Sequence, residues 1–417
     1  MDVTVGYGDS YQNVDIAPEN LMGIMKANTV KYDLVGAAEV QRALDAPIGT
    51  ATLHEIVMPG ESIAIITSDI TRPLPTWEIL PPILEELYRA GIKKSDISIV
   101  LALGSHRMHT EEEKRRLVGP AVYGDIRVVD SLSEEMVSFG KTMVGTPVDI
   151  NQTVAEADRR ICLGNVEYHY FAGYSGGAKA IMPGVSTPGA ISVNHALMVD
   201  PLACAGNLDT NPVRLDIEEA ARMVGVDFLV NVVLDEEKQI IKACAGDVVA
   251  AHREACRFLD SLYRIDIPHR ADIVIDSQGG SPKDLNLYQT QKALDNSKYA
   301  VRPGGIVILV GSCKEGLGNA CFGEWMHAAQ TPQDIIDRLQ TEFVLGGHKA
   351  AAVAKIQMMA DVFLVSDLNP DLARDCFFTP FETLQDAYDE AVRRIGFDAQ
   401  VLVMPHGGST VPHVIGE

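Results

Sequence analysis

Residues 62–103, SIAIITSDITRPLPTWEILPPILEELYRAGIKKSDISIVLAL, decide the fold of this chain. Residues 62–67 form a short run rich in β-branched side chains, which predicts a buried strand. Residues 76–90 carry apolar side chains at helical spacing, and residues 97–103 form a second apolar, β-branched run. The order strand, helix, strand predicts a βαβ unit with parallel strands.

The same alternation continues along the chain, which at 417 residues is long for a single core. The sequence predicts further strands at residues 126–129, 160–163, 227–233, 272–276, 305–310 and 400–404. It also predicts one more helix, at residues 287–300. We therefore predict an α/β fold of two domains with mainly parallel, Rossmann-like sheets and an active site in the cleft between them. The N-terminal domain is predicted to span residues 1–267 and the C-terminal domain residues 268–417.

Composition and charge narrow the class of partner. The hydrophobic fraction of 47% and the charged fraction of 22% are typical of a soluble globular protein. With 35 basic against 57 acidic residues, the net charge of -22 argues against nucleic acid or an anionic membrane surface as the main partner, because both repel such a chain. An anionic small substrate stays possible, since a few local cations dominate inside a dry cleft.

Cysteine usage and the N-terminus indicate the compartment. The seven cysteines are odd in number, and none are spaced as C-x-x-C, so they indicate neither a disulfide framework nor a thiolate zinc site. We expect a cytoplasmic protein on this basis. The first ten residues, MDVTVGYGDS, do not have the pattern of a signal peptide, and no apolar run is long enough to span a bilayer.

Two short motifs directly follow predicted strands, where ligands bind in doubly wound sheets. Residues 68–73, SDITRP, contain Asp69 and Arg72, which can bind hydroxyls and a carboxylate, respectively. Taken alone, a local ion pair that closes the turn explains this motif better. Residues 104–107, GSHR, contain His106, either a general acid or base whose ordinary pKa lies near the working pH, or an exposed or capping histidine.

The most informative stretch is GNVEYHYFAGYSGGAK, residues 164–179. Within it, Ser175, Gly176 and Gly177 allow backbone amides to approach a phosphate closely. The spacing is not that of a Walker A loop, because alanine follows Lys179, and it is not a Rossmann fingerprint. Lys179 is therefore a phosphate contact, a covalent cofactor anchor or, least in keeping with so apolar a segment, a surface lysine after a turn.

Two further motifs are ambiguous by themselves. Residues 194–197, NHAL, contain His195, and a lone helical histidine is more often packed or exposed than a metal ligand. No H-x-x-x-H or H-E-x-x-H spacing occurs, so any bound metal must take most of its ligands from a cofactor. Tyr288 and Lys292 are four residues apart beside Gln289, and they form either a carboxylate clamp or a solvated helix face.

Taken together and in this order, these segments resemble the nickel-dependent lactate racemase family. The resemblance covers the chain from residue 60 to about 310, and its most specific part is the block at residues 164–186, GNVEYHYFAGYSGGAKAIMPGVS. The family carries a nickel pincer nucleotide, a pyridinium-3-thioamide-5-thiocarboxylate mononucleotide that holds nickel. The resemblance implies an N-terminal domain that binds this cofactor and a C-terminal domain that contributes residues to substrate binding.

The resemblance also implies a role for each matching residue. Lys179 would form the covalent thioamide link, and His195 would be the protein ligand to nickel. His106 and His169 would be the two proton-transfer residues. The remaining assignments are Asp69 at the cofactor, and Arg72, Tyr288, Gln289 and Lys292 at the substrate. The chemistry of the glycine loop further suggests that Ser175, Gly176 and Gly177 lie near the cofactor phosphate.

The implied reaction inverts C2 of a 2-hydroxy acid, lactate or a related acid, by reversible hydride transfer to the cofactor through a 2-keto acid. The Cα–H bond is too weakly acidic for deprotonation by histidine, which favours hydride transfer. The hydroxyl proton needs a base, and the hydroxyl points in another direction after the 2-keto acid has reoriented, so two histidines are needed. The expected partners are a small 2-hydroxy acid and the enzymes that make the cofactor. The alternatives are an NAD-dependent 2-hydroxy acid dehydrogenase and a non-catalytic nickel or nucleotide carrier.

Overall fold

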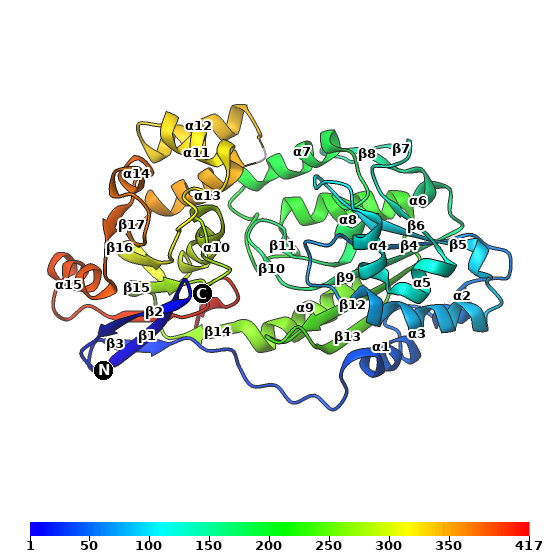
Figure 1. Cartoon of the computed structure of the whole chain (residues 1–417), viewed down its shortest axis with the longest axis horizontal. Coiled ribbons are helices and arrows are strands. Elements are labelled where there is room, and N and C mark those ends of the chain that lie inside the picture. Colours follow the sequence, from blue (N-terminus) through cyan, green and yellow to red (C-terminus); the bar gives the residue numbers. More distant parts are fainter. Residues whose placement is uncertain (345, 417) are drawn as a thin grey trace. The chain divides into compact units, whose positions relative to one another are not determined.

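The computed structural model describes residues 1–344 and 346–416. The chain divides into two compact units (Figure 1). The central unit is Val30–Ser261, and the terminal unit combines Met1–Thr29 with Leu262–Glu417. The first 29 residues, which the sequence assigned to the N-terminal domain, therefore belong with the C-terminal part of the chain.

The central unit is built on one six-stranded sheet with the order β13-β12-β9-β4-β5-β6. Its strands are β4 (Ile63–Ser68), β5 (Ile97–Ala102), β6 (Arg127–Asp130), β9 (Arg159–Asn165), β12 (Phe228–Leu234) and β13 (Ile240–Gly246). Two short strand pairs lie outside this sheet: β7 (Met136–Lys141) with β8 (Pro147–Asn151), and β10 (Tyr168–His169) with β11 (Gly173–Tyr174). All neighbours in the sheet are parallel except β12 and β13. The strands predicted in this part of the sequence are confirmed.

Helices cover the sheet of the central unit. They are α1 (Gly36–Asp45), α2 (Leu53–Ile56), α3 (Thr76–Arg89), α4 (Glu111–Val118), α5 (Pro120–Asp125), α6 (Gln152–Glu156), α7 (Pro188–Ala196), α8 (Pro212–Val224) and α9 (Ala250–Tyr263). Ile65 and Ile161 belong to the same core as the apolar residues of α1 and α3. Ile66 and Cys162, the next residues along β4 and β9, are fully buried as well. Both faces of the sheet are therefore covered, which is why its strands are continuous apolar runs rather than alternating ones.

The strand order of the central unit reverses beside β4. The chain passes from β4 to β5 and β6 on one side of β4, and then returns to β9 and β12 on the other side. In open α/β sheets, ligands bind beyond the carboxyl ends of the strands at such a reversal. The loops that follow β4, β5 and β9 carry the SDITRP, GSHR and GNVEYHYFAGYSGGAK motifs, so the topology gathers these three motifs at one edge.

The terminal unit has a second six-stranded sheet, entirely parallel, with the order β18-β17-β16-β15-β19-β3. Its elements are the strands β1 (Asp2–Tyr7), β2 (Ser10–Asp15), β3 (Leu21–Ile24), β14 (Arg264–Ile267), β15 (Ala271–Ser277), β16 (Val301–Val310), β17 (Asp361–Val365), β18 (Thr379–Phe381), β19 (Val401–Met404) and β20 (Val411–Val414), and the helices α10 (Leu287–Ser297), α11 (Ala320–Ala328), α12 (Pro332–Thr341), α13 (Gly347–Gln357), α14 (Pro370–Asp375) and α15 (Leu384–Ile395). The strands and the helix predicted here are confirmed, the helix ending three residues early.

The N-terminal strands explain why the first residues join the terminal unit. β3 extends the sheet by pairing with β19, and β1 runs against the glycine-rich turn after β15. A Cβ atom on Gly6 would lie only 2.4 Å from the carbonyl carbon of Gly279, so this close approach requires glycine. The contact is between residues more than 270 positions apart, and nothing local in the sequence predicts it.

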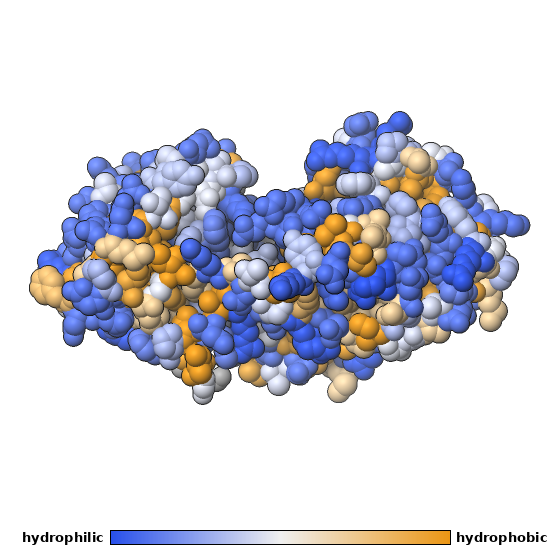
Figure 2. All heavy atoms as spheres, turned by 90° about the horizontal axis from the view of Figure 1, so that it is seen from below, coloured by the Kyte–Doolittle hydropathy of each residue, from blue (hydrophilic) through white to orange (hydrophobic). Residues whose placement is uncertain are grey.

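The surface view in Figure 2 shows mostly hydrophilic residues, with apolar side chains in separate patches. Over residues 1–344 and 346–416, no helix has both the length and the apolar character needed to cross a membrane.

Candidate functional site

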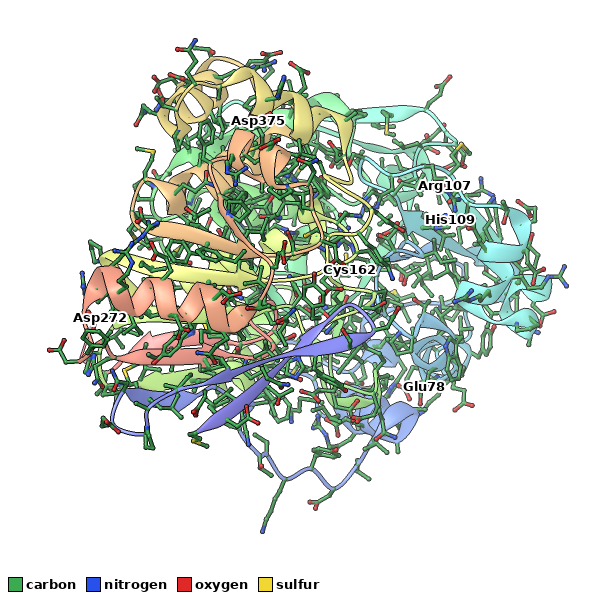
Figure 3. The ribbon with its side chains drawn as sticks, turned by 60° about the vertical axis from the view of Figure 1, so that its left-hand side comes forward. Glu78, Arg107, His109, Cys162, Asp272 and Asp375 are labelled. Carbon is green, nitrogen blue, oxygen red and sulfur yellow. The ribbon has the colours of Figure 1, made fainter. Side chains whose placement is uncertain are left out.

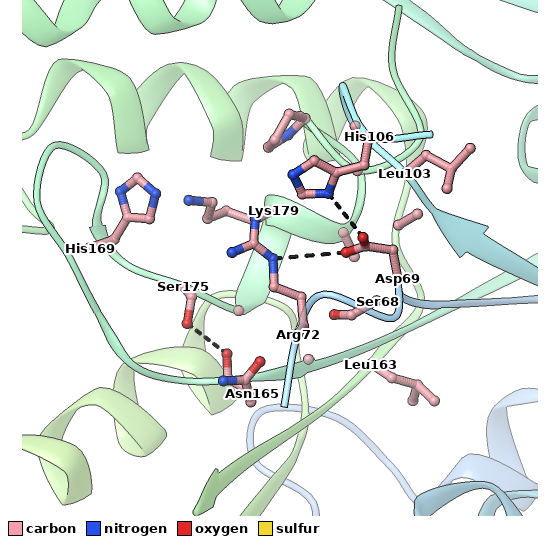
Figure 4. Close-up of a pocket in the computed structure, with 17 residues that line it drawn as sticks. Ser68, Asp69, Arg72, Leu103, His106, Leu163, Asn165, His169, Ser175 and Lys179 are labelled. Carbon is pink, nitrogen blue, oxygen red and sulfur yellow. Dashed lines mark hydrogen bonds and ion pairs between the residues drawn. The ribbon is translucent and has the colours of Figure 1, made fainter. Parts of the chain in front are cut away.

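A pocket lies at the carboxyl ends of β4, β5 and β9 in the central unit (Figure 4). The predicted site residues that line it are Asp69, Arg72, His106, His169, Ser175, Gly176 and Lys179. These residues come from three loops that lie about 30 to 60 residues apart in the sequence. The reversal of strand order brings the three loops together. The structure thus assembles most of the predicted central-unit residues around one cavity.

Asp69 and His106 form a hydrogen-bonded pair at one side of this pocket. His106 Nδ1 lies 2.9 Å from Asp69 Oδ2, and the hydroxyl of Thr71 donates to the other carboxylate oxygen at 3.1 Å. Burial by itself would raise the pKa of Asp69, but the bonds from His106 and Thr71 hold it below its ordinary value. The ionised carboxylate accepts the Nδ1 proton of His106 and leaves Nε2 as the proton-accepting atom.

Arg72 lies beside the same carboxylate. Its Nε is 3.9 Å from Asp69 Oδ1, and its side chain is 56% exposed. Figure 4 shows the guanidinium extending into the pocket near Lys179. The ion pair that the sequence suggested as the simpler explanation is therefore present, and it leaves the guanidinium N–H groups of Arg72 open to an anion in the pocket.

His169 stands on the β10–β11 hairpin, on the other side of Lys179 in Figure 4. Its Nδ1 accepts the backbone N–H of Ala172 at 3.2 Å, and its ring packs edge-on against Phe171 with centroids 4.5 Å apart. Burial, followed by the nearby charges of Lys179 and Arg72, holds the pKa of His169 well below its ordinary value. The imidazole is therefore neutral, with Nε2 available to a ligand oxygen.

Lys179 lies in a short 3-10 turn, Gly177–Ala180, and its side chain faces the pocket. Its ammonium nitrogen is 6.0 Å from the centre of the Phe171 ring, and no hydrogen bond or ion pair reaches it from the residues that the structure describes. Burial and then the charges of Arg214 and Arg72 hold the pKa of Lys179 well below its ordinary value. This environment favours the uncharged amine, which is the nucleophilic form of a lysine.

The glycine loop before Lys179 is shaped by contacts with the protein itself. The backbone N–H of Gly177 donates to Asn231 Oδ1 at 2.8 Å, and the hydroxyl of Ser175 donates to the carbonyl oxygen of Asn165 at 2.8 Å. A Cβ atom on Gly177, whose φ is +60°, would lie 2.7 Å from the ring of His252. Ser175 and Gly176 line the pocket, whereas Gly177 is a packing glycine with its N–H already bonded.

His195 lies on α7 outside the pocket lining, next to the aromatic residues of the hairpin. Its ring centroid is 4.9 Å from that of Phe171. Its Nδ1 lies 3.1 Å from Asn194 Oδ1, and its role as a metal ligand stays a prediction. In the part of the chain that the structure describes, no three His, Cys, Asp or Glu residues converge as a metal site, so any metal bound here needs ligands from another source.

A buried histidine that sequence reasoning did not select holds the SDITRP loop in place. His109, in the segment after β5 (Figure 3), donates from Nδ1 to Asp130 Oδ1 at 2.5 Å. Its Nε2 accepts the backbone N–H of Ile70 at 3.1 Å. His109 therefore anchors the residue next to Asp69. No local signal in the sequence selects His109, because only the fold shows that Asp130, at the end of β6, is its partner.

Comparison with known proteins decides the family. Residues 7–206 match the family model of the lactate racemase N-terminal domain, and residues 267–411 match that of the lactate racemase C-terminal domain. The chain is 33% identical to the lactate racemase of Thermoanaerobacterium thermosaccharolyticum over 422 residues, covering 98% of this chain and 99% of the relative. This chain belongs to the lactate racemase family.

Other members and structures of the lactate racemase family agree. The lactate racemase of Lactiplantibacillus plantarum is 35% identical over 406 residues, covering 94% of this chain and 95% of the relative. The lactate racemase apoprotein of T. thermosaccharolyticum superposes with a TM-score of 0.90 at 32% identity, covering 99% of this chain and 100% of that chain. A Thermotoga maritima protein shares the fold, with a TM-score of 0.65 at 17% identity, covering 91% of this chain and 98% of that chain. As a member of this family, the chain is an isomerase, a racemase.

The lactate racemase C-terminal domain contains the remaining predicted residues. Tyr288, Gln289 and Lys292 lie on α10, with the first two half-buried and Lys292 exposed. Lys349, which the sequence analysis did not select, places its ammonium nitrogen 3.8 Å from the centre of the Tyr288 ring and donates to the Tyr288 carbonyl oxygen at 3.3 Å. The substrate-binding role of the three α10 residues stays a prediction.

Proposed function

We propose that this chain racemises or epimerises a small 2-hydroxy acid, with lactate as the first candidate, and that it does so with a nickel pincer nucleotide linked to Lys179. Family membership and the names of its relatives support the reaction class and the choice of lactate. The observation that carries the rest of the proposal is the pocket itself: Lys179, whose pKa is held well below its ordinary value, lies between two histidines, one of which is paired with a buried carboxylate.

The residues present fit such a cofactor. Lys179 faces the pocket, and its lowered pKa favours the uncharged amine that a covalent anchor needs. His195 offers one nitrogen and no second protein ligand converges with it among the described residues, which suits a metal whose other ligands come from the nucleotide. When bound, the group supplies an acceptor for the hydride that leaves C2 of the substrate.

The histidines of this chain handle the hydroxyl proton in the proposed reaction. His106, with Nδ1 bonded to Asp69, accepts the proton at Nε2, and the carboxylate stabilises the imidazolium that forms. His169, whose Nδ1 accepts the backbone N–H of Ala172, carries its ring proton on Nε2 and directs this N–H to the same oxygen after the planar 2-keto acid has reoriented. Two proton-transfer residues are needed because this oxygen points in different directions before and after inversion.

Cationic side chains bind the carboxylate in the proposed complex. Arg72 presents guanidinium N–H groups to the pocket, and paired N–H donors match a carboxylate in geometry as well as in charge. We also assign Tyr288, Gln289 and Lys292 to the substrate, because the sequence resemblance gives them this role. The overall charge of -22 does not oppose this binding, since the local cations act at short range in a poorly solvated pocket.

The test begins with protein co-expressed with the enzymes that make the cofactor. Intact mass, peptide mapping and nickel analysis should show a nucleotide-sized adduct on Lys179 and about one nickel per chain. The control variant K242R changes a lysine of β13 outside the pocket and should leave the adduct unchanged, whereas K179R should abolish it. The loaded protein should then bring pure L- or D-lactate to a racemic mixture, as followed by chiral chromatography.

Each alternative predicts a different result in the same experiment. A plain dehydrogenase would produce the 2-keto acid only with added NAD and without an adduct on Lys179. A carrier would hold the adduct and nickel but leave the optical purity of every 2-hydroxy acid tested unchanged. An unmodified Lys179 in cells that demonstrably make the cofactor contradicts the proposal.

A further inference from the structure

Two neutral polar side chains of the pocket have no part in the reaction proposed above. Ser68 is the last residue of β4, Asn165 is the last residue of β9, and both line the pocket. The strands β4 and β9 are parallel neighbours in the sheet. In the view of Figure 4, both side chains lie below the two histidines of the site. The sheet thus presents a hydroxyl and an amide on neighbouring strands at one side of the pocket.

Neither side chain has a hydrogen-bond partner in the protein. Asn165 is 4% exposed, and its bond with Ser175 uses the backbone carbonyl oxygen of Asn165, which accepts the serine hydroxyl at 2.8 Å. Over residues 1–344 and 346–416, no hydrogen bond reaches the amide of Asn165 or the hydroxyl of Ser68. A polar group that is shut away from bulk water without a partner destabilises a fold. The two groups are explained if a ligand supplies the partners.

The chemistry of these two groups selects hydroxyls as their ligand. A serine hydroxyl and a carboxamide can each donate and accept hydrogen bonds. A phosphate or a carboxylate mainly accepts, so it would leave the amide oxygen of Asn165 facing an anion. The carboxylate of Asp69, which follows Ser68 and lines the same pocket, also repels an anion at this position. A hydroxyl both donates and accepts, so it can satisfy the serine and the asparagine together.

We propose that Ser68 and Asn165 form a hydroxyl-binding site that holds the sugar of the nucleotide cofactor. The inference rests on the proposed function, because the nucleotide is taken as the occupant of the pocket. The ribose of a mononucleotide carries two adjacent hydroxyls, which are the groups that the two side chains need. Side chains at the ends of sheet strands are held more rigidly than side chains on loops. They therefore orient the nucleotide, while Lys179 provides its covalent link.

The test measures the binding of nicotinic acid mononucleotide, a pyridinium mononucleotide with an intact ribose, to the full-length chain without cofactor. Isothermal titration calorimetry compares it with its 2′-deoxy and 3′-deoxy analogues. In the unmodified chain, at least one deoxy analogue should bind about threefold to tenfold more weakly, the usual effect of a lost neutral hydrogen bond. S68A and N165L should each reduce this preference for ribose, and S68A/N165L should bring it to within about twofold.

The comparison between analogues separates binding of the sugar from a merely structural role. A disturbed pocket weakens the ribose and deoxy forms alike, and it leaves the ratio of their affinities unchanged. Leucine has nearly the volume of asparagine, so N165L removes the polar atoms with little change in packing. The control S95A/N13A changes an exposed serine and an exposed asparagine outside the pocket, and it should keep the full preference for ribose.

Three results would overturn the inference. They are no detectable binding of nicotinic acid mononucleotide to the unmodified chain, equal binding of all three analogues, and an undiminished preference in folded S68A/N165L. If N165L does not fold, S68A decides alone, and an unchanged preference in S68A contradicts the role of the pair. Attachment to Lys179 and racemisation are measured on other samples, by mass and by chiral chromatography. A chain that carries the adduct and racemises lactate but fails this binding test therefore loses only the hydroxyl-binding site.

Discussion

At the residue scale, the site depends on partners that fix the proton positions of its histidines. Asp69 lies 2.9 Å from Nδ1 of His106, which would make Nε2 the proton acceptor in the proposed reaction, and Asn194 Oδ1 lies 3.1 Å from Nδ1 of His195. In each case a single contact selects one tautomer, and a tautomer decides which atom can react. The identity of the histidine is visible in the sequence, but its reactive nitrogen is set by the neighbour.

Replacement of either proposed base tests these roles directly. H106Q and H169Q should each reduce the turnover of cofactor-loaded enzyme by about 10² to 10⁴, the usual contribution of general acid–base catalysis. Racemisation is measured by chiral chromatography, with nickel and adduct content determined on the same samples. The control H327Q changes a histidine that is 74% exposed and should have no effect. Full activity in a correctly loaded H106Q or H169Q protein would rule out a base role for that residue.

At the element scale, helices α8 and α9 hold the segment that follows β9. Arg214 on α8 bonds three of its carbonyls, and His252 on α9 donates to the carbonyl oxygen of Ser175 at 2.8 Å. Asp260, also on α9, accepts the hydroxyls of Tyr168 and Tyr174 at 2.7 Å each. The segment has little regular structure of its own, so these side chains take the place of a sheet in fixing its shape.

The Asp260 contact can be tested through stability. D260A should lower the free energy of unfolding by about 1 to 3 kcal/mol, because two tyrosine hydroxyls lose their acceptor. Urea titration followed by circular dichroism measures the change, and D209A, at a position 91% exposed, serves as the control. In a double-mutant cycle, Y168F should cost less in the D260A background than alone. Strict additivity of the two changes would show that the contact contributes nothing.

At the scale of the whole molecule, the two ends of the chain form one unit. Val5 and Ile16 are buried at 1% and 0% exposure in the same core as Ile275 and Ile308, and β3 covers the edge of β19. The first residues are therefore structural parts of a sheet whose other strands follow residue 270. The central unit, in contrast, is formed by one continuous stretch of sequence.

Removal of residues 1–24 should destabilise the terminal unit alone. The loss of several buried aliphatic side chains, each contributing about 1.5 to 3 kcal/mol, exceeds the stability that an ordinary domain has in reserve. Limited proteolysis with mass analysis should show digestion after residue 262 and persistence of a fragment close to 30–261. The exposed substitution Y11A, at 72% exposure, should leave the digestion pattern unchanged. A truncated chain whose C-terminal part resists protease would contradict this organisation.

The sequence by itself determined the α/β class, the main strands of both sheets and the motifs that meet at the pocket, because apolar periodicity and loops after strands are local properties. It did not reveal the antiparallel β12–β13 pair, the place of residues 1–29, the bond from His106 to Asp69 or the grip of Arg214 on residues 172–176. These features join segments from tens to hundreds of residues apart. Only the tertiary structure decides them, because they depend on which buried surfaces meet and on which polar groups must find partners once water is excluded.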